Sequence, residues 1–131
     1  MKVTRIEFKS EFGNIGFLLK LHKVDLYCAH RSAVEAEGIE SICAFADPKN
    51  RVIILIEEDC DQLSNDSIRA IICHELAHII DPTISEEGAD YFAACNTSRQ
   101  AVHKAVCETE NVRNRIRTVR DGMYTPMAVE F

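Results

Sequence analysis

The chain has no tryptophan, only five glycines and three prolines, and no long hydrophobic run. The scarcity of glycine and proline excludes collagen-like and low-complexity chains, whereas 47% hydrophobic and 27% charged residues are typical of a packed globular domain. The longest aliphatic run, Val52–Ile56, is too short to cross a bilayer. A length of 131 residues predicts a single domain over residues 1–131.

Further absences concern the cellular compartment and the partners. Residues 1–7 carry charges where a signal peptide needs an apolar core. The six cysteines include no C-x-x-C pair, so we predict that they are reduced and mostly buried. A formal charge of −6 disfavours binding of the whole molecule to nucleic acid or anionic lipid. These patterns predict a cytoplasmic protein that has no membrane partner.

Periodicity predicts an α+β fold in which a β-hairpin precedes three helices. Residues 3–8 alternate loosely enough for a first strand, and residues 11–22 favour a helix. Two β-rich runs, 42–46 and 52–56, flank turn-forming residues, which predicts a hairpin with a buried second strand. The three helices are expected at 64–81, from 86 to a break at 96–98, and at 98–119.

The first of these helices has its own start and stop signals. Ser64 can cap its N-terminus, and Pro82 prevents its continuation. One arc of the helix is aliphatic and is formed by Ile68, Ile72, Leu76, Ile79 and Ile80. His74, Glu75 and His78 lie on a different arc. We therefore expect one face to pack and the other to carry chemistry.

The sequence His74-Glu75-Leu76-Ala77-His78 is an H-E-x-x-H motif. Histidines four residues apart lie one turn apart on the same face, so both can bind one Zn²⁺ ion. Glu75 is placed to exchange a proton with a metal-activated water and not to ligate the metal beside both histidines. The alternative is that both histidines are ordinary surface residues, although an accidental motif is expected only about a few times per thousand such chains.

An acidic segment follows His78 and opens the next predicted helix. Glu86 and Asp90 are four residues apart, so one can bind the metal while the other accepts the far ring N–H of a ligand histidine. We assign that hydrogen bond to His74. The alternative is that Glu86 and Glu87 only complement the positive end of the helix dipole.

These motifs resemble those of the gluzincin zinc metallopeptidases. His74-Glu75-x-x-His78 followed by Glu86-x-x-Ala89-Asp90-x-Phe92-Ala93 is similar to the pattern of the CAAX-prenyl-protease and HtpX peptidases and of their soluble single-domain relatives, the minigluzincins. The ImmA-type proteases come second, with Asn in place of Asp90. The similarity covers residues 42–107, although the gap between the second histidine and the acidic segment is shorter than usual in these families.

The resemblance implies a zincin-like fold in which His74, His78 and Glu86 bind Zn²⁺. It also implies that Glu75 is the general base and acid, that Asp90 orients a histidine, and that one hairpin strand forms the cleft edge along which an extended peptide pairs. The short gap leaves Glu86 and Glu87 as candidates for the third ligand, and the A-D-x-F-A register favours Glu86.

Two features outside the motif bear on function. His103 and Tyr124 are candidates for a side chain that stabilises an oxyanion, although no spacing supports either. The C-terminal quarter carries a basic stripe formed by Arg113, Arg115, Arg117 and Arg120. The sequence predicts a zinc-dependent peptidase with protein or peptide substrates. The rival hypothesis is a non-catalytic zinc-binding module, or a regulator that binds a partner or nucleic acid through the Arg stripe.

Overall fold

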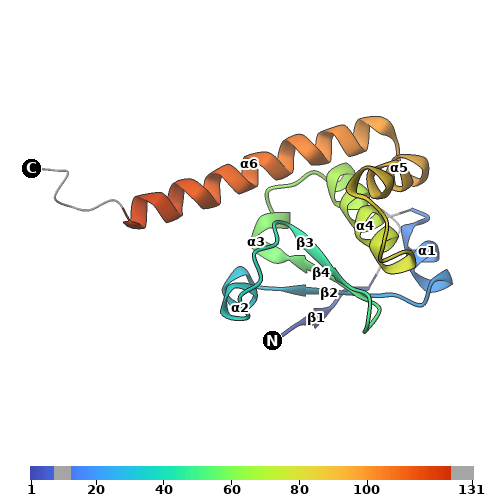
Figure 1. Cartoon of the computed structure of the whole chain (residues 1–131), viewed down its shortest axis with the longest axis horizontal. Helices are drawn as coiled ribbons and strands as arrows, with labels where there is room; N and C mark the ends of the chain where they lie inside the picture. Colours follow the sequence, from blue (N-terminus) through green and yellow to red (C-terminus); the bar gives the residue numbers. More distant parts are fainter. Residues whose placement is uncertain (8–12, 125–131) are drawn as a thin grey trace, which may run out of the picture.

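The computed structural model describes residues 1–7 and 13–124, and the side chains as far as residue 117. Within these residues the chain forms one four-stranded sheet and six helices (Figure 1). The strands are β1 (Thr4–Arg5), β2 (Asp25–Ala29), β3 (Ala44–Asp47) and β4 (Val52–Ile56). The helices are α1 (Ile15–Leu21), α2 (Arg31–Ala36), α3 (Glu57–Cys60), α4 (Asn65–Ile80), α5 (Glu86–Asn96) and α6 (Arg99–Tyr124).

The sheet has the strand order β1-β2-β4-β3, so β3 forms one edge. β3 and β4 are the two strands of the predicted hairpin, and they pair antiparallel with Asp47 opposite Val52. β2 pairs parallel with β4, whereas β1 pairs antiparallel with β2. β4 is therefore a central strand, and the edge strand β3 lies beside α4.

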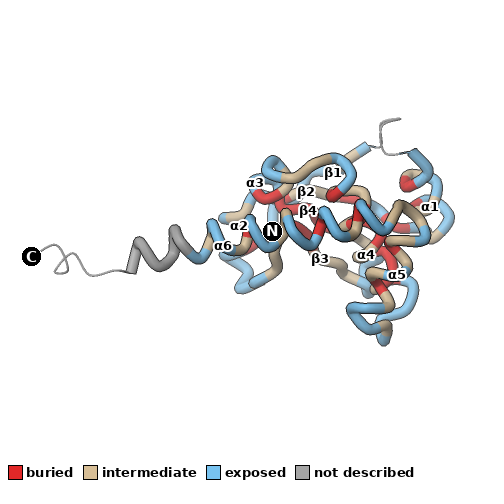
Figure 2. The backbone as a smooth tube through the Cα atoms, turned by 90° about the horizontal axis from the view of Figure 1, so that it is seen from above, coloured by how far each residue is buried: buried red, intermediate tan, exposed pale blue. Residues whose placement is uncertain are grey.

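The sheet is covered on both faces, which explains the uniformly apolar sequence of β4. Ile53 and Leu55 join the core that α1 and α4 share with one face of the sheet. Ile54 and Ile56 pack with Val34 of α2 on the other face. A strand that is covered on both sides carries apolar residues at every position. Figure 2 shows the buried residues gathered around β2, β4 and α4.

The α+β fold expected from the sequence is confirmed, but the predicted order of hairpin and three helices omits β2, α2 and α3. β2 pairs with β4, which lies more than twenty residues later in the chain, so no local turn signal announces it. α2 and α3 are short, and neither has a side chain that caps its N-terminus. The helix expected at 11–22 is α1, and the strand expected at 3–8 is β1; residues 8–12 lie outside the described residues.

α4 is close to the predicted helix. The Ser64 side chain caps it by accepting a hydrogen bond from the N–H of Ser67 at 3.3 Å. The expected packing face is confirmed at Ile72, Leu76 and Ile79, which are buried. The prediction was wrong for Ile80, which is 41% exposed. This residue ends the helix and adjoins the exposed residues 81–83, so no element covers it.

α5 and α6 meet at the break predicted around residues 96–98. The hydroxyl of Ser85 caps α5 by accepting the N–H of Gly88 at 2.9 Å. α6 crosses α4 and continues to Tyr124, beyond the end expected at residue 119. Its C-terminal part extends past α3 and α2 (Figure 1). None of the helices in the described ranges is both long and apolar enough to span a membrane.

All six cysteines are free, as predicted, but only Cys43 and Cys73 are buried. Cys95 of α5 and Cys107 of α6 are exposed, so the expectation that the cysteines are mostly buried was wrong for these two residues. Burial raises the pKa of the Cys60 thiol to about 12, and Cys43, Asp59 and Asp61 add to the increase. Cys60 is therefore a thiol at neutral pH and unreactive.

Candidate metal centre

Three potential metal ligands converge where α4 meets the start of α5. Nε2 of His74 lies 3.2 Å from Nε2 of His78 and 3.0 Å from Oε2 of Glu86, and Nε2 of His78 lies 3.1 Å from Oε1 of Glu86. The two imidazole rings are partly buried, whereas Glu86 is exposed. The group His74, His78 and Glu86 could therefore hold a metal ion, and Glu86, not Glu87, is its carboxylate.

The separation of the two imidazole nitrogens fits a tetrahedral ion. Ligand atoms at about 2.0–2.1 Å from a tetrahedral Zn²⁺ lie about 3.3 Å from one another, and the two Nε2 atoms are 3.2 Å apart. The Glu86 carboxylate approaches His74 with Oε2 and His78 with Oε1, at 3.0 and 3.1 Å. Two imidazoles and one carboxylate are also a common donor set of zinc sites that leave one position open.

The Asp90 side chain occupies the position predicted for it. Its Oδ1 lies 2.7 Å from Nδ1 of His74. A carboxylate can only accept, so Nδ1 of His74 carries the proton in this contact. The other ring nitrogen, Nε2, faces the carboxylate of Glu86 and the ring of His78. A metal ion at this point would bind Nε2 through its lone pair, with Asp90 holding the proton on Nδ1.

Glu75 lies next to this group in a partly buried position on α4. Burial raises the pKa of its carboxyl to about 7; Glu86 contributes in the same direction, whereas His74 and a hydrogen bond from the Ala46 N–H oppose the increase. A cation held by the neighbouring histidines would lower this pKa. The contact with Ala46 places the Glu75 carboxyl beside the edge strand β3.

A groove of about 280 Å³ includes these side chains and is lined by α4, α5, α6 and residues 42–43 before β3. Its polar lining includes His74, Glu75, Glu86 and Asp90. Its walls are formed by Ile42, Cys43, Ala70, Ile71, Ala93, Val102, Ala105 and Val106, and by Thr109, Glu110 and Arg113. The candidate metal centre is therefore part of a larger groove that has both polar and apolar walls.

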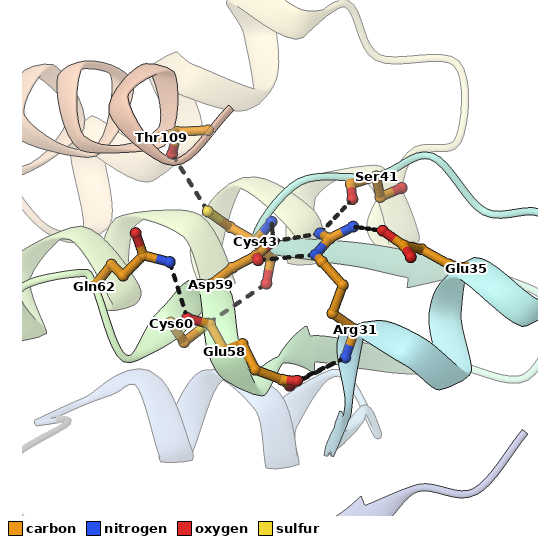
Figure 3. Close-up of polar contacts among 9 residues, drawn as sticks. All are labelled: Arg31, Glu35, Ser41, Cys43, Glu58, Asp59, Cys60, Gln62 and Thr109. Atoms are coloured by element: carbon orange, nitrogen blue, oxygen red, sulfur yellow. Dashed lines mark hydrogen bonds and ion pairs between the residues drawn. The ribbon is translucent and has the colours of Figure 1, made fainter. Parts of the chain in front are cut away.

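A buried ion pair supports the β3 side of the groove (Figure 3). Asp59 of α3 is 1% exposed and accepts hydrogen bonds from Nε of Arg31 at 2.9 Å and from the N–H of Cys43 at 2.8 Å. Arg31 also donates to the carbonyl of Ser41 at 3.0 Å. Cys43 has a φ of 68°, which is unfavourable for a residue with a side chain. The Asp59 carboxylate thus holds the turn that leads into β3.

Of the two candidates for oxyanion stabilisation, the structure describes only the side chain of His103, and it does not join the group. His103 is exposed on α6 and does not line the groove; its Nε2 lies 3.7 Å from Sγ of Cys107. The side chain of Tyr124 lies outside the described residues. In the Arg stripe, Arg113 pairs with Glu110 and lines the groove, Arg115 donates to Gln62, and the side chain of Arg120 is again outside the description.

The sequence reasoning missed the groove and the network behind it. The signal for one groove wall was present, because Val102, Ala105 and Val106 recur at spacings of three and four on the last helix. No comparable signal connects Arg31 with Asp59, since the two residues lie 28 positions apart in elements that the pattern did not reveal.

The fold and the site together define a small α+β domain with a His-His-Glu group that could bind a metal ion. Comparison with known protein families, curated proteins and solved structures finds no match to this chain. The resemblance to gluzincins therefore rests on the motif residues themselves.

Proposed function

We propose that the protein is a zinc-dependent peptidase that hydrolyses peptide bonds of protein or peptide substrates. The observation that carries the proposal is the geometry of one cluster, in which the two motif histidines, Glu86 and the orienting Asp90 meet as the H-E-x-x-H chemistry requires. A zinc ion bound there would polarise the scissile carbonyl and acidify an attacking water.

The chain's own residues supply the remaining steps. Glu75 is not part of the ligand group and lies beside it, so its carboxylate can accept a proton from the attacking water and return it to the leaving nitrogen. Asp90 keeps the proton on Nδ1 of His74, which leaves Nε2 free to ligate. The edge strand β3 offers backbone groups with which an extended substrate can pair.

The substitution Glu75→Gln tests the proposal. We expect the variant to bind zinc and to fold as the wild type does, but to cleave a generic protein substrate at least about 100-fold more slowly, because it cannot accept the proton. Elemental analysis reports zinc content, and mass spectrometry of the digest reports cleavage. Glu87→Gln, a neighbouring exposed acid, is the matched control and should retain activity.

Equal cleavage by the wild type and Glu75→Gln would contradict the peptidase proposal. Zinc binding by both proteins with cleavage by neither would instead favour the rival hypothesis of a non-catalytic zinc-binding module.

A further inference from the structure

His103 and Cys107 form a pair of potential metal ligands on α6 that the proposed peptidase does not use. Nε2 of His103 lies 3.7 Å from Sγ of Cys107, and both side chains are exposed. Neither residue lines the groove that contains the His-His-Glu group. Because the two residues are four positions apart on a helix, their side chains lie one turn apart on the same face. The pair is therefore open to a small solute and separate from the site described above.

The separation of these two atoms is close to the one that a shared metal ion needs. Zn²⁺ binds thiolate sulfur at about 2.3 Å and imidazole nitrogen at about 2.0–2.1 Å, so a tetrahedral ion holds the two ligand atoms about 3.5–3.6 Å apart. The observed separation is 3.7 Å. An ion could therefore replace the proton of this hydrogen bond with little movement of either side chain.

Cys107 differs from the other cysteines of this chain in two respects. It is exposed, as is Cys95, whereas burial raises the pKa of the remaining four thiols, which are Cys28, Cys43, Cys60 and Cys73. A thiol must lose its proton to bind a metal, so these four are poor ligands at neutral pH. Cys95 has no histidine one turn away, since residues 91 and 99 are tyrosine and arginine. Cys107 thus combines exposure with an imidazole neighbour.

We propose that His103 and Cys107 form a second metal site, which takes a thiophilic cation such as Zn²⁺ or Cu⁺. Sulfur and imidazole nitrogen are ligands that these ions prefer, whereas Mg²⁺ and Ca²⁺ prefer oxygen. Water completes the coordination, because Glu110, the next acid on this face of α6, is paired with Arg113. With two protein ligands, the site binds its ion more weakly than the three-ligand group does. The inference does not depend on the proposed peptidase function.

Absorption titration with Cd²⁺ tests the inference on the full chain, kept reduced by a phosphine. Cd²⁺ takes the same ligands as Zn²⁺, and a bound thiolate adds an ultraviolet charge-transfer band that nitrogen and oxygen ligands do not give. We expect this band in the wild type, its loss in Cys107→Ser, and at least about tenfold weaker binding in His103→Ala. Cys95→Ser removes an exposed thiol that has no histidine neighbour, so this matched control should keep the band.

The variant His78→Ala separates this inference from the first metal centre. It lacks one ligand of that group but should show the same Cd²⁺ band as the wild type. The inference is overturned if the wild type gives no band, if Cys107→Ser keeps it, or if Cys95→Ser or His78→Ala loses it. Equal affinity of His103→Ala and the wild type overturns it too, because the thiol would then bind the ion without the imidazole. Both ligands are exposed, so we expect their variants to fold as the wild type does.

Discussion

At the scale of single residues, the centre depends on which ring nitrogen of His74 carries the proton. Asp90 holds that proton on Nδ1, and the opposite nitrogen is turned toward Glu86 and His78. The i, i+4 spacing of Glu86 and Asp90 predicted that one carboxylate can bind the metal while the other accepts from the ring, and the family resemblance implied which acid takes which role. Which acid of the pair at 86 and 87 turns inward was settled by the structure.

The substitution Asp90→Asn should weaken zinc binding about 10- to 100-fold, because the ring of His74 loses the charge that holds its tautomer and orientation. Competition with a chromophoric chelator measures the affinity. Glu87→Gln removes the same negative charge nearby but leaves the contact between Asp90 and His74 intact, so this variant should bind zinc as the wild type does. An unchanged affinity in Asp90→Asn would remove the orienting role from this residue.

At the scale of helices and strands, single carboxylates connect elements that are distant in the chain. Asp59 connects α3 with α2 and with the turn before β3. Glu108 of α6 accepts hydrogen bonds from the N–H of Ser64 at 2.7 Å and from the hydroxyl of Ser67 at 2.6 Å, and so reinforces the cap of α4. These contacts fix the two sides of the groove, and neither was apparent from periodicity.

We expect Glu108→Gln to lower the free energy of unfolding by about 1–2 kcal/mol near neutral pH, because the cap loses its charged acceptor. Burial alone would raise the pKa of Glu108, but hydrogen bonds from Ser67 and Ser64 outweigh it and lower the pKa. The stabilisation is therefore present above the ordinary glutamate pKa of about 4.3 and is lost as the pH falls through the lower folded-state pKa.

Urea denaturation of both proteins from pH 3 to pH 7 checks this prediction. The difference between wild type and Glu108→Gln should shrink in acid. A difference that stays constant over this range would show that the ionised carboxylate does not stabilise the cap. Glu110→Gln, two residues further along α6 and exposed, serves as the control.

At the scale of the whole molecule, a bound metal would tie α4 to α5, and α6 packs against both of these helices. A ligand that binds only the folded state stabilises it by about 2.7 kcal/mol at a concentration 100 times its Kd. For a chain of this size we therefore expect zinc to raise Tm by about 10 °C, and a chelator to reverse the change. Differential scanning calorimetry measures the shift.

The variant His78→Ala is the control for this experiment, because it removes one ligand from the group. It should show little or no zinc-dependent increase in Tm. The same increase in this variant as in the wild type would place the stabilising ion elsewhere in the protein.

The sequence by itself determined the parts of this protein that depend on neighbours in the chain. A cap at Ser64, an aliphatic stripe and a proline define α4, and four-residue spacing puts two imidazoles on one face and Glu86 beside Asp90. Such relations follow from helix geometry, so they could be predicted without the fold. The hairpin of β3 and β4 was also predictable, because its two strands are neighbours in the chain and are joined by turn-forming residues.

Only the tertiary structure decided what the rest of the chain adds to the site. The pairing of β2 with β4, the Arg31–Asp59 ion pair and the crossing of α6 over α4 join residues that are far apart in the chain. These contacts are selected by burial and charge pairing across the whole molecule, which leave no periodic trace in the sequence. They create the groove beside the candidate metal ligands.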